Sequence, residues 1–72
     1  MILKYDSYIV DDFEGWDGDA VYELDNGTKW RLAHYKYEYH YIYRPKAKIW
    51  QSGTKYFLEV EGMDEKVEVL MD

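Results

Sequence analysis

The chain has 72 residues, no cysteine and a formal net charge of −6. This length fits one domain, and the absence of cysteine excludes disulfide-stapled miniproteins, thiolate zinc sites and thiol nucleophiles. Nine Tyr, three Trp and two Phe give a small core the apolar area it needs, because each ring can bury on the order of 150 to 250 Å². The first residues contain no basic region followed by an apolar run, and no window is apolar enough for a membrane span, so we expect a soluble, cytoplasmic protein without membrane partners.

The first half of the chain predicts strands on either side of an acidic loop. Residues 2–10 read as a first strand, whereas residues 11–19 contain five acids and two glycines, which is typical of an irregular loop. Residues 20–24 and 28–33 are extended runs joined by Asp25-Asn26-Gly27. An Asn-Gly pair in this setting predicts a β-hairpin with a type I′ turn.

A tyrosine-rich segment follows at residues 34–44. Tyrosine occupies every second position, so an extended chain would place five rings on one face and His34, His40 and the charged residues on the other. A helix would scatter the rings around its axis. We therefore expect extended structure, which a bulge or bend could divide between two sheets.

In the last third of the chain, apolar and polar residues alternate, as in strands with one buried and one exposed face. Residues 45–51 place Ala47 and Ile49 opposite Lys46, Lys48 and Trp50. Residues 56–61 and 66–71 form two further alternating runs joined by a short turn at residues 62–65. The whole pattern predicts a single all-β domain, residues 1–72, built as a small barrel of five or six antiparallel strands.

Charge is divided into three blocks along the chain. Residues 1–30 carry −6, residues 31–56 carry +5 and residues 57–72 carry −5. If these blocks occupied different faces, the molecule would be an electrostatic dipole.

Several elements together resemble a known family. They are Phe13-Glu-Gly-Trp-Asp-Gly-Asp-Ala-Val-Tyr-Glu-Leu-Asp-Asn-Gly-Thr-Lys-Trp, Tyr35-Lys-Tyr-Glu-Tyr-His-Tyr and Arg44-Pro45. This combination is similar to a family of small uncharacterised prokaryotic proteins, over about residues 7–62. The resemblance implies a small SH3-like β-barrel, and it implies no activity and no catalytic residues.

The tyrosine segment is the strongest candidate for a functional surface. Rings flanked by cations could stack the bases of single-stranded nucleic acid, and residues 31–56 supply both. The same rings could instead bind a protein, a peptide or a second copy of the chain. Against both stands packing, because a core this small needs several of the rings for itself. The candidate binding residues are Trp16, Tyr35, Tyr37, Tyr39, Tyr41, Tyr43, Arg44, Lys46 and Lys48.

The tryptophans and the acidic loop support the peptide interpretation. We expect Trp30, next to the hairpin turn, to lie in the core, and Trp16, between acids and glycines, to be exposed. The acids of residues 11–19 could face a basic partner, as in SH3-type domains, although this rests on analogy of fold. Their spacing does not match a calcium loop.

Catalytic and metal sites have little support in the sequence. His34 and His40 lie about 20 Å apart on an extended strand, which is too far for one metal ion unless the chain bends. Ser7 and Ser52 have no nucleophile motif, and the five glycines form no phosphate-binding loop. We therefore expect a non-enzymatic interaction module without cofactor or metal, with nucleic-acid binding as the alternative.

Overall fold

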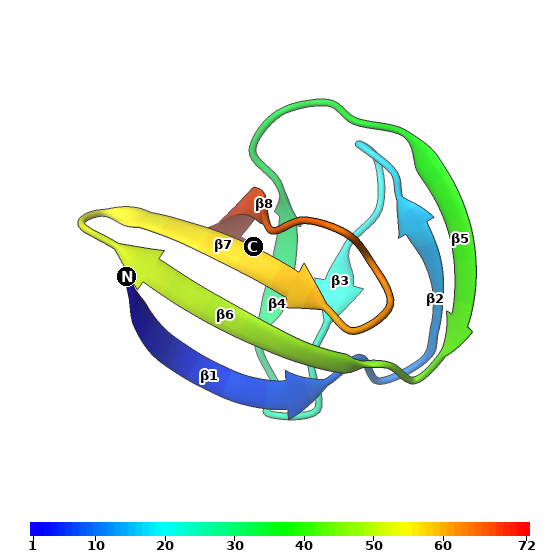
Figure 1. Cartoon of the computed structure of the whole chain (residues 1–72), viewed down its shortest axis with the longest axis horizontal. Helices are drawn as coiled ribbons and strands as arrows, with labels where there is room; N and C mark the ends of the chain where they lie inside the picture. The colour runs from blue at the N-terminus through cyan, green and yellow to red at the C-terminus, as the bar shows by residue number, and fades with distance from the viewer.

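The chain folds into eight antiparallel strands, in a computed structural model that describes all 72 residues (Figure 1). The strands are β1 (Ile2–Tyr8), β2 (Asp12–Trp16), β3 (Tyr22–Glu23), β4 (Lys29–Leu32), β5 (Glu38–Tyr43), β6 (Lys46–Ser52), β7 (Lys55–Val60) and β8 (Val67–Met71). The predicted all-β class is confirmed. The predicted number of five or six strands is too low, because each of the seven extended segments described above contains a strand and residues 12–16, expected to be a loop, add β2.

Six strands form one sheet and two form another. The large sheet has the order β1-β6-β7-β8-β4-β3, and β2 pairs with β5 in a separate two-stranded ribbon (Figure 1). The edge strands β1 and β3 approach each other at a single bridge between Ile9 and Leu24. The hydrogen-bonded pairing therefore does not close into a barrel, although the large sheet curves around one core.

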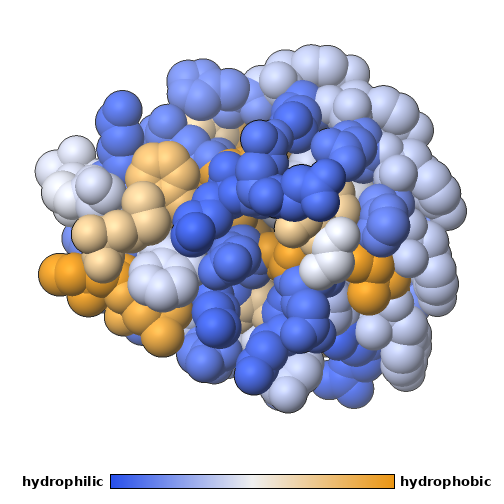
Figure 2. Space-filling view, viewed as in Figure 1, coloured by the Kyte–Doolittle hydropathy of each residue, from blue (hydrophilic) through white to orange (hydrophobic).

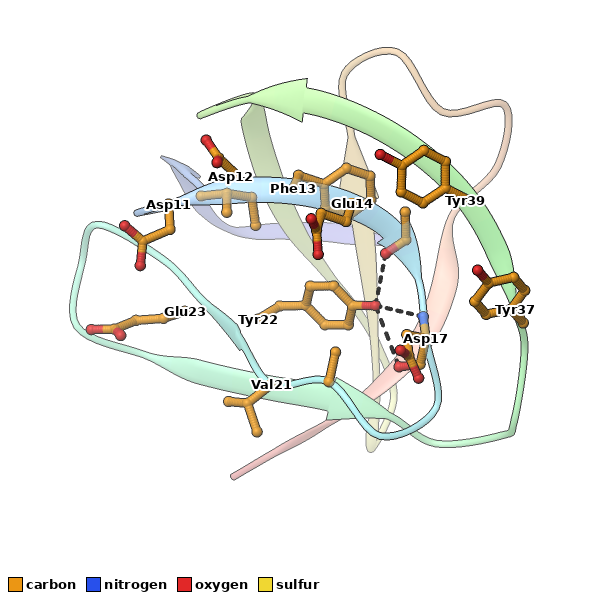
Figure 3. A pocket seen from close by; sticks show the side chains of 13 residues that line it. Asp11, Asp12, Phe13, Glu14, Asp17, Val21, Tyr22, Glu23, Tyr37 and Tyr39 are labelled. Atoms are coloured by element: carbon orange, nitrogen blue, oxygen red, sulfur yellow. Dashed lines mark hydrogen bonds between the residues drawn. The ribbon is translucent and has the colours of Figure 1, made fainter.

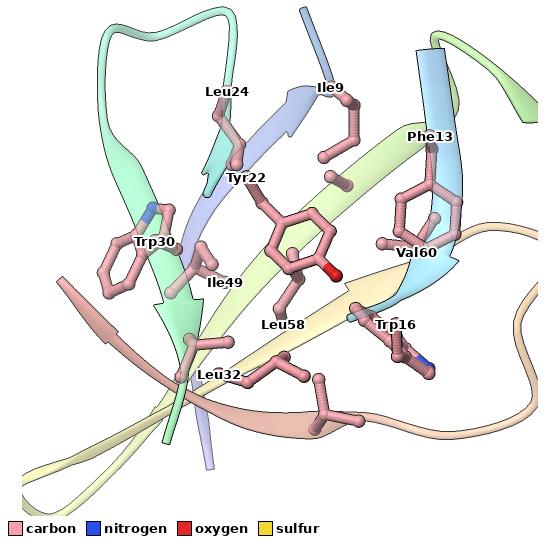
Figure 4. Close-up of a cluster of buried hydrophobic side chains, with 13 residues drawn as sticks. Ile9, Phe13, Trp16, Tyr22, Leu24, Trp30, Leu32, Ile49, Leu58 and Val60 are labelled. Carbon is pink, nitrogen blue, oxygen red and sulfur yellow. The ribbon is translucent and has the colours of Figure 1, made fainter. Parts of the chain in front are cut away.

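The core follows the alternation of the strands. The inward residues of β6 are Ala47 and Ile49, which are buried, and directly across from them on β7 lie Val60 and Leu58. Outward positions on the same two strands carry charge, and Lys48 is opposite Glu59. The predicted strands over residues 45–51, 56–61 and 66–71 are thus confirmed with their predicted faces. Thirteen apolar side chains form the core (Figure 4).

Two local predictions in the first half need correction. Residues 12–16 form strand β2 rather than loop, because burial of Phe13 and Trp16 and pairing with β5 outweigh the acids and glycines around them. The hairpin between β3 and β4 is present, but its turn is not type I′. Only Gly27 has a positive φ (89°), and its N–H donates to the Leu24 carbonyl, as in a three-residue turn with a glycine bulge.

Candidate aromatic binding face

The β2–β5 ribbon carries the tyrosine segment on the outside of the molecule. Phe13 of β2 is buried in the core, and Ile42, its partner across the ribbon, packs against that core. These inward side chains hold the ribbon in place, so the opposite side of both strands faces solvent. Figure 1 shows β5 as the outermost strand of the molecule, with β2 between it and the interior.

A bulge and a glycine let the two strands of the ribbon approach closely. Two residues of β5, His40 and Tyr41, oppose the single residue Glu14 of β2. Next to this bulge, Gly15 has φ 96°, and a Cβ there would lie 1.9 Å from the carbonyl oxygen of Glu38. Only glycine combines this conformation with this approach.

All five tyrosines of the segment are exposed. Their exposed fractions range from 52% for Tyr41 to 80% for Tyr35. The expectation that several of them fill the core is wrong, because Trp16, Trp30 and Phe13 occupy the interior with the aliphatic residues. Tyr22 is the one buried tyrosine of the nine in the chain.

Four of these rings share one surface with two carboxylates. Tyr37 and Tyr39 line a groove together with Glu14 of β2. Tyr41 lies beside Asp12, and Tyr43 lines a second hollow that both Asp12 and Glu14 border. We call this surface the ring-carboxylate face, and it consists of Asp12, Glu14, Tyr37, Tyr39, Tyr41 and Tyr43. Pale side chains over β5 mark its edge at the right of Figure 2.

Tyr35 does not belong to this face. It precedes β5, its ring covers Gly18, and it borders a different hollow with His34 and Glu68. The predicted row of five rings is therefore a group of four. The chain changes direction before β5 begins, and strict alternation ends there.

The groove at one end of the ring-carboxylate face has a volume of about 480 Å³. In Figure 3, Tyr37 and Tyr39 stand on one side of it and Tyr22 crosses its floor. The Tyr22 hydroxyl donates to the carbonyl oxygen of Gly15 at 2.9 Å and accepts a hydrogen bond from the Asp17 N–H at 2.8 Å. These bonds fix the chain that leaves β2.

Two tyrosines near the groove have a raised pKa. Burial is the main cause for Tyr22, and the negative charge of Asp17 adds to it. For Tyr41, desolvation raises the pKa first, and the neighbouring Asp12 carboxylate raises it further. Both hydroxyls therefore stay protonated, as donors, beyond the ordinary range of tyrosine.

The acids that line the groove have no ion-pair partner within the molecule. They are Asp11, Asp12, Glu14, Asp17 and Glu23. The ion pairs of the molecule join Arg31 to Asp72, His34 to Glu68 and Lys36 to Glu65, and none of them involves a residue of the groove. The groove is thus negatively charged and uncompensated.

The tryptophans do not behave as a set of exposed anchors. Trp30 is buried, as predicted, and its Nε1–H donates to Thr28 Oγ1 at 2.9 Å. Trp16 is only 1% exposed, so the prediction of an exposed Trp16 is wrong. Its ring packs edge-on against Phe13 and Tyr22, and its Nε1–H has no hydrogen-bond partner. Trp50 is partly exposed and donates to Glu59.

The predicted cations are not gathered around the rings. Arg44 borders the hollow beside Tyr43, whereas Lys46 and Lys48 lie on the outer side of β6 next to Glu59 and Glu61. The basic block of the sequence is therefore interleaved with acids in space, and it does not form a separate positive face.

Asp12 and Glu14 were expected only as part of an acidic loop, and their position on a strand beside the tyrosines was not foreseen. The signal was present as the pattern Asp12-Phe13-Glu14, which places an apolar side chain between two charged ones, as an edge strand does. The surrounding glycines and acids concealed it.

The two histidines and the acids do not form a metal centre. No group of three or more His, Cys, Asp or Glu residues is arranged to hold a metal ion. His34 contacts Glu68 at 3.2 Å and is exposed, and His40 is exposed on β5. No helix of the structure could cross a membrane.

No protein-family model, curated protein or solved structure matches this chain. The structure itself shows a small all-β protein with a six-stranded sheet, a two-stranded ribbon and an exposed aromatic face.

Proposed function

We propose that this protein is a non-enzymatic interaction module that binds a protein or peptide segment on its ring-carboxylate face. The exposure of four neighbouring tyrosines, three on β5 and Tyr37 just before it, on a segment that the core holds in place carries this proposal. Tyrosine is enriched at protein interfaces because a rigid ring offers a large contact area and its hydroxyl offers a hydrogen bond.

The finer part of the proposal concerns the fold class. We propose an SH3-like architecture and kinship with the uncharacterised prokaryotic family that the sequence resembles. The Ile9–Leu24 bridge supports this, because it links the ends of the two edge strands, β1 and β3. Further pairing between these two strands would close the curved sheet into a barrel.

The charge distribution favours a protein partner over single-stranded nucleic acid. Carboxylates adjoin the rings, and phosphate groups would be repelled by Asp12 and Glu14. Lys46 and Lys48, which a nucleic-acid backbone would need, lie beside acids on β6 instead.

A peptide titration followed by NMR tests the proposal. We expect peptides from a varied panel to shift the backbone amides of residues 37–43, and Tyr39→Ala to weaken binding several-fold. Tyr8→Ala is the matched control, since Tyr8 is exposed on β1, outside the face. Amides of residues 37–43 that stay unmoved across the panel would contradict it.

Titration with a single-stranded oligonucleotide at low salt tests the alternative function, nucleic-acid binding. Binding that weakens steeply with salt and is lost in Tyr37→Ala or Tyr41→Ala would replace the protein partner by nucleic acid.

A further inference from the structure

The charged positions of the ring-carboxylate face follow the repeat of a β-strand. Asp12 and Glu14 are exposed and Phe13 between them is buried. Their side chains therefore leave the same side of β2, about 7 Å apart, which is two residues of an extended chain. The rings of β5 stand beside them.

This spacing matches a ligand of the same conformation. An extended peptide lying along the ribbon would present every second side chain to it, also about 7 Å apart. Cations at alternate positions of such a peptide would meet Asp12 and Glu14 in register. Two adjacent cations of an extended ligand point to opposite sides of it, so only one of them would face the ribbon.

The rings complement the same ligand. A cation over the face of a tyrosine ring is attracted by its π electrons, and Arg and Lys also have long apolar stems that cover rings. In this protein, the tyrosines of the face have no internal cation over them, since the cation–π contacts involve Lys4 with Tyr5 and Lys66 with Trp50. Arg44 borders one end of the face without pairing to its acids.

We propose that the partner is an extended segment with Arg or Lys at alternate positions, whose cations pair with Asp12 and Glu14 while their stems lie against the tyrosines of β5. This inference rests on the proposed function and adds the charge and the periodicity of the partner. The observation behind it is that two carboxylates without an ion-pair partner lie beside four exposed rings, on the two-stranded ribbon and the residue that precedes β5.

Two peptides of equal composition test the periodicity. One has Arg at every second position with Thr between, and the other has the same residues with all Arg at one end. We expect the alternating peptide to bind about threefold or more tightly at the same ionic strength. Equal affinities would overturn the inference, since total charge alone would then explain binding.

Charge neutralisation tests the two carboxylates. Asp12→Asn and Glu14→Gln should each weaken the alternating peptide by roughly two- to fivefold, as for exposed ion pairs. Asp25→Asn removes the same charge from the exposed β3–β4 turn, away from the face, and should leave the affinity unchanged. An equal effect of all three substitutions would overturn the inference.

Reversing the charge of one carboxylate should create a new affinity, and a misfolded variant would not show such a gain. Glu14→Lys should lower affinity for the Arg peptide and raise affinity for the corresponding alternating Glu peptide. Neutral peptides that bind the same tyrosines equally well in wild type and Asp12→Asn would overturn the basic partner and leave the interaction module intact. Failure of every peptide would instead refute the module itself.

Discussion

Gly15 is the residue on which the geometry of the ribbon depends most directly. It combines a left-handed φ of 96° with a backbone approach that leaves no space for a side chain. Gly27 has a similar φ of 89° but open space where a Cβ would lie. A side chain at Gly27 would meet only the strained conformation, whereas a side chain at Gly15 would also clash with its neighbours.

Gly15→Ala should be much more destabilising than Gly27→Ala. For Gly27→Ala we expect about 1 to 2 kcal/mol from the left-handed conformation alone. For Gly15→Ala, overpacking against the Glu38 carbonyl adds roughly 1 to 3 kcal/mol. Urea unfolding of both variants measures the difference, and equal losses would show that β5 moves aside at no cost.

The Tyr22 ring lies in the core, and its hydroxyl bonds to the backbone at the end of β2. Tyr22→Phe keeps the ring but removes the donor to Gly15 and the acceptor of the Asp17 N–H. We expect a loss of about 1 to 3 kcal/mol at pH 7, because these backbone groups lie in a buried or partly buried setting. Tyr8→Phe, whose hydroxyl has no partner within the protein, should be neutral in urea unfolding.

The raised pKa of Tyr22 also predicts a dependence on alkaline pH. The unfolded chain loses this proton near pH 10, before the folded protein does. The stability that the neutral hydroxyl contributes is therefore present below about pH 10 and is lost as pH rises through the higher folded pKa. Unfolding free energies of wild type should fall more steeply above pH 10 than those of Tyr22→Phe, and parallel curves would contradict this.

At the scale of elements, the two-stranded ribbon differs from the large sheet. β5 has one hydrogen-bonded neighbour, whereas β6 and β7 each have two. The ribbon is held mainly by inward side chains such as Phe13 and Ile42, and by Lys36, which forms an ion pair with Glu65. β5 has no fully buried side chain and one edge without a strand partner, and such exposed backbone favours local opening.

Native-state hydrogen exchange should therefore distinguish the two sheets. Amides of β5 that bond to β2 are expected to exchange with a lower opening free energy than those between β6 and β7. Phe13→Leu should lower protection in the ribbon more than in the large sheet. Uniform protection across both sheets would show that the molecule opens as one unit.

The bulge in β5 makes this edge strand a poor partner for strands of other chains. A long aromatic edge strand invites uncontrolled pairing with other chains, and a bulge blunts such an edge. Because His40 and Tyr41 oppose one residue of β2, the backbone of β5 is irregular at its middle. The binding proposal accordingly uses side chains of the face rather than addition of a strand to the edge.

At the scale of the whole molecule, the three charge blocks do not become three faces. Antiparallel pairing places Lys48 opposite Glu59. Lys36 reaches Glu65, and Lys4 lies over the half-buried ring of its neighbour Tyr5. The excess negative charge remains where no basic strand is adjacent, around β2 and the groove. The blocks are therefore divided between local pairs of opposite charge and one uncompensated acidic region, and the condition for an electrostatic dipole is not met.

Much of the fold was predictable from alternation alone. The strands β6, β7 and β8 have their expected faces because side-chain direction along a strand depends only on local geometry. The acidic segment before them was misread, since glycines and acids signal a loop unless a partner strand supplies hydrogen bonds and a buried neighbour. That partner, β5, lies more than twenty residues away.

The sequence by itself determined a small cysteine-free all-β protein, its alternating strands and the concentration of tyrosine in one segment. Tertiary structure alone decided that these rings face solvent, that Trp16 is buried, and that Asp12 and Glu14 lie beside the rings. The physical reason is that periodicity specifies which side chains share a face of a strand. Which face is covered depends on the segments that the rest of the chain packs against it.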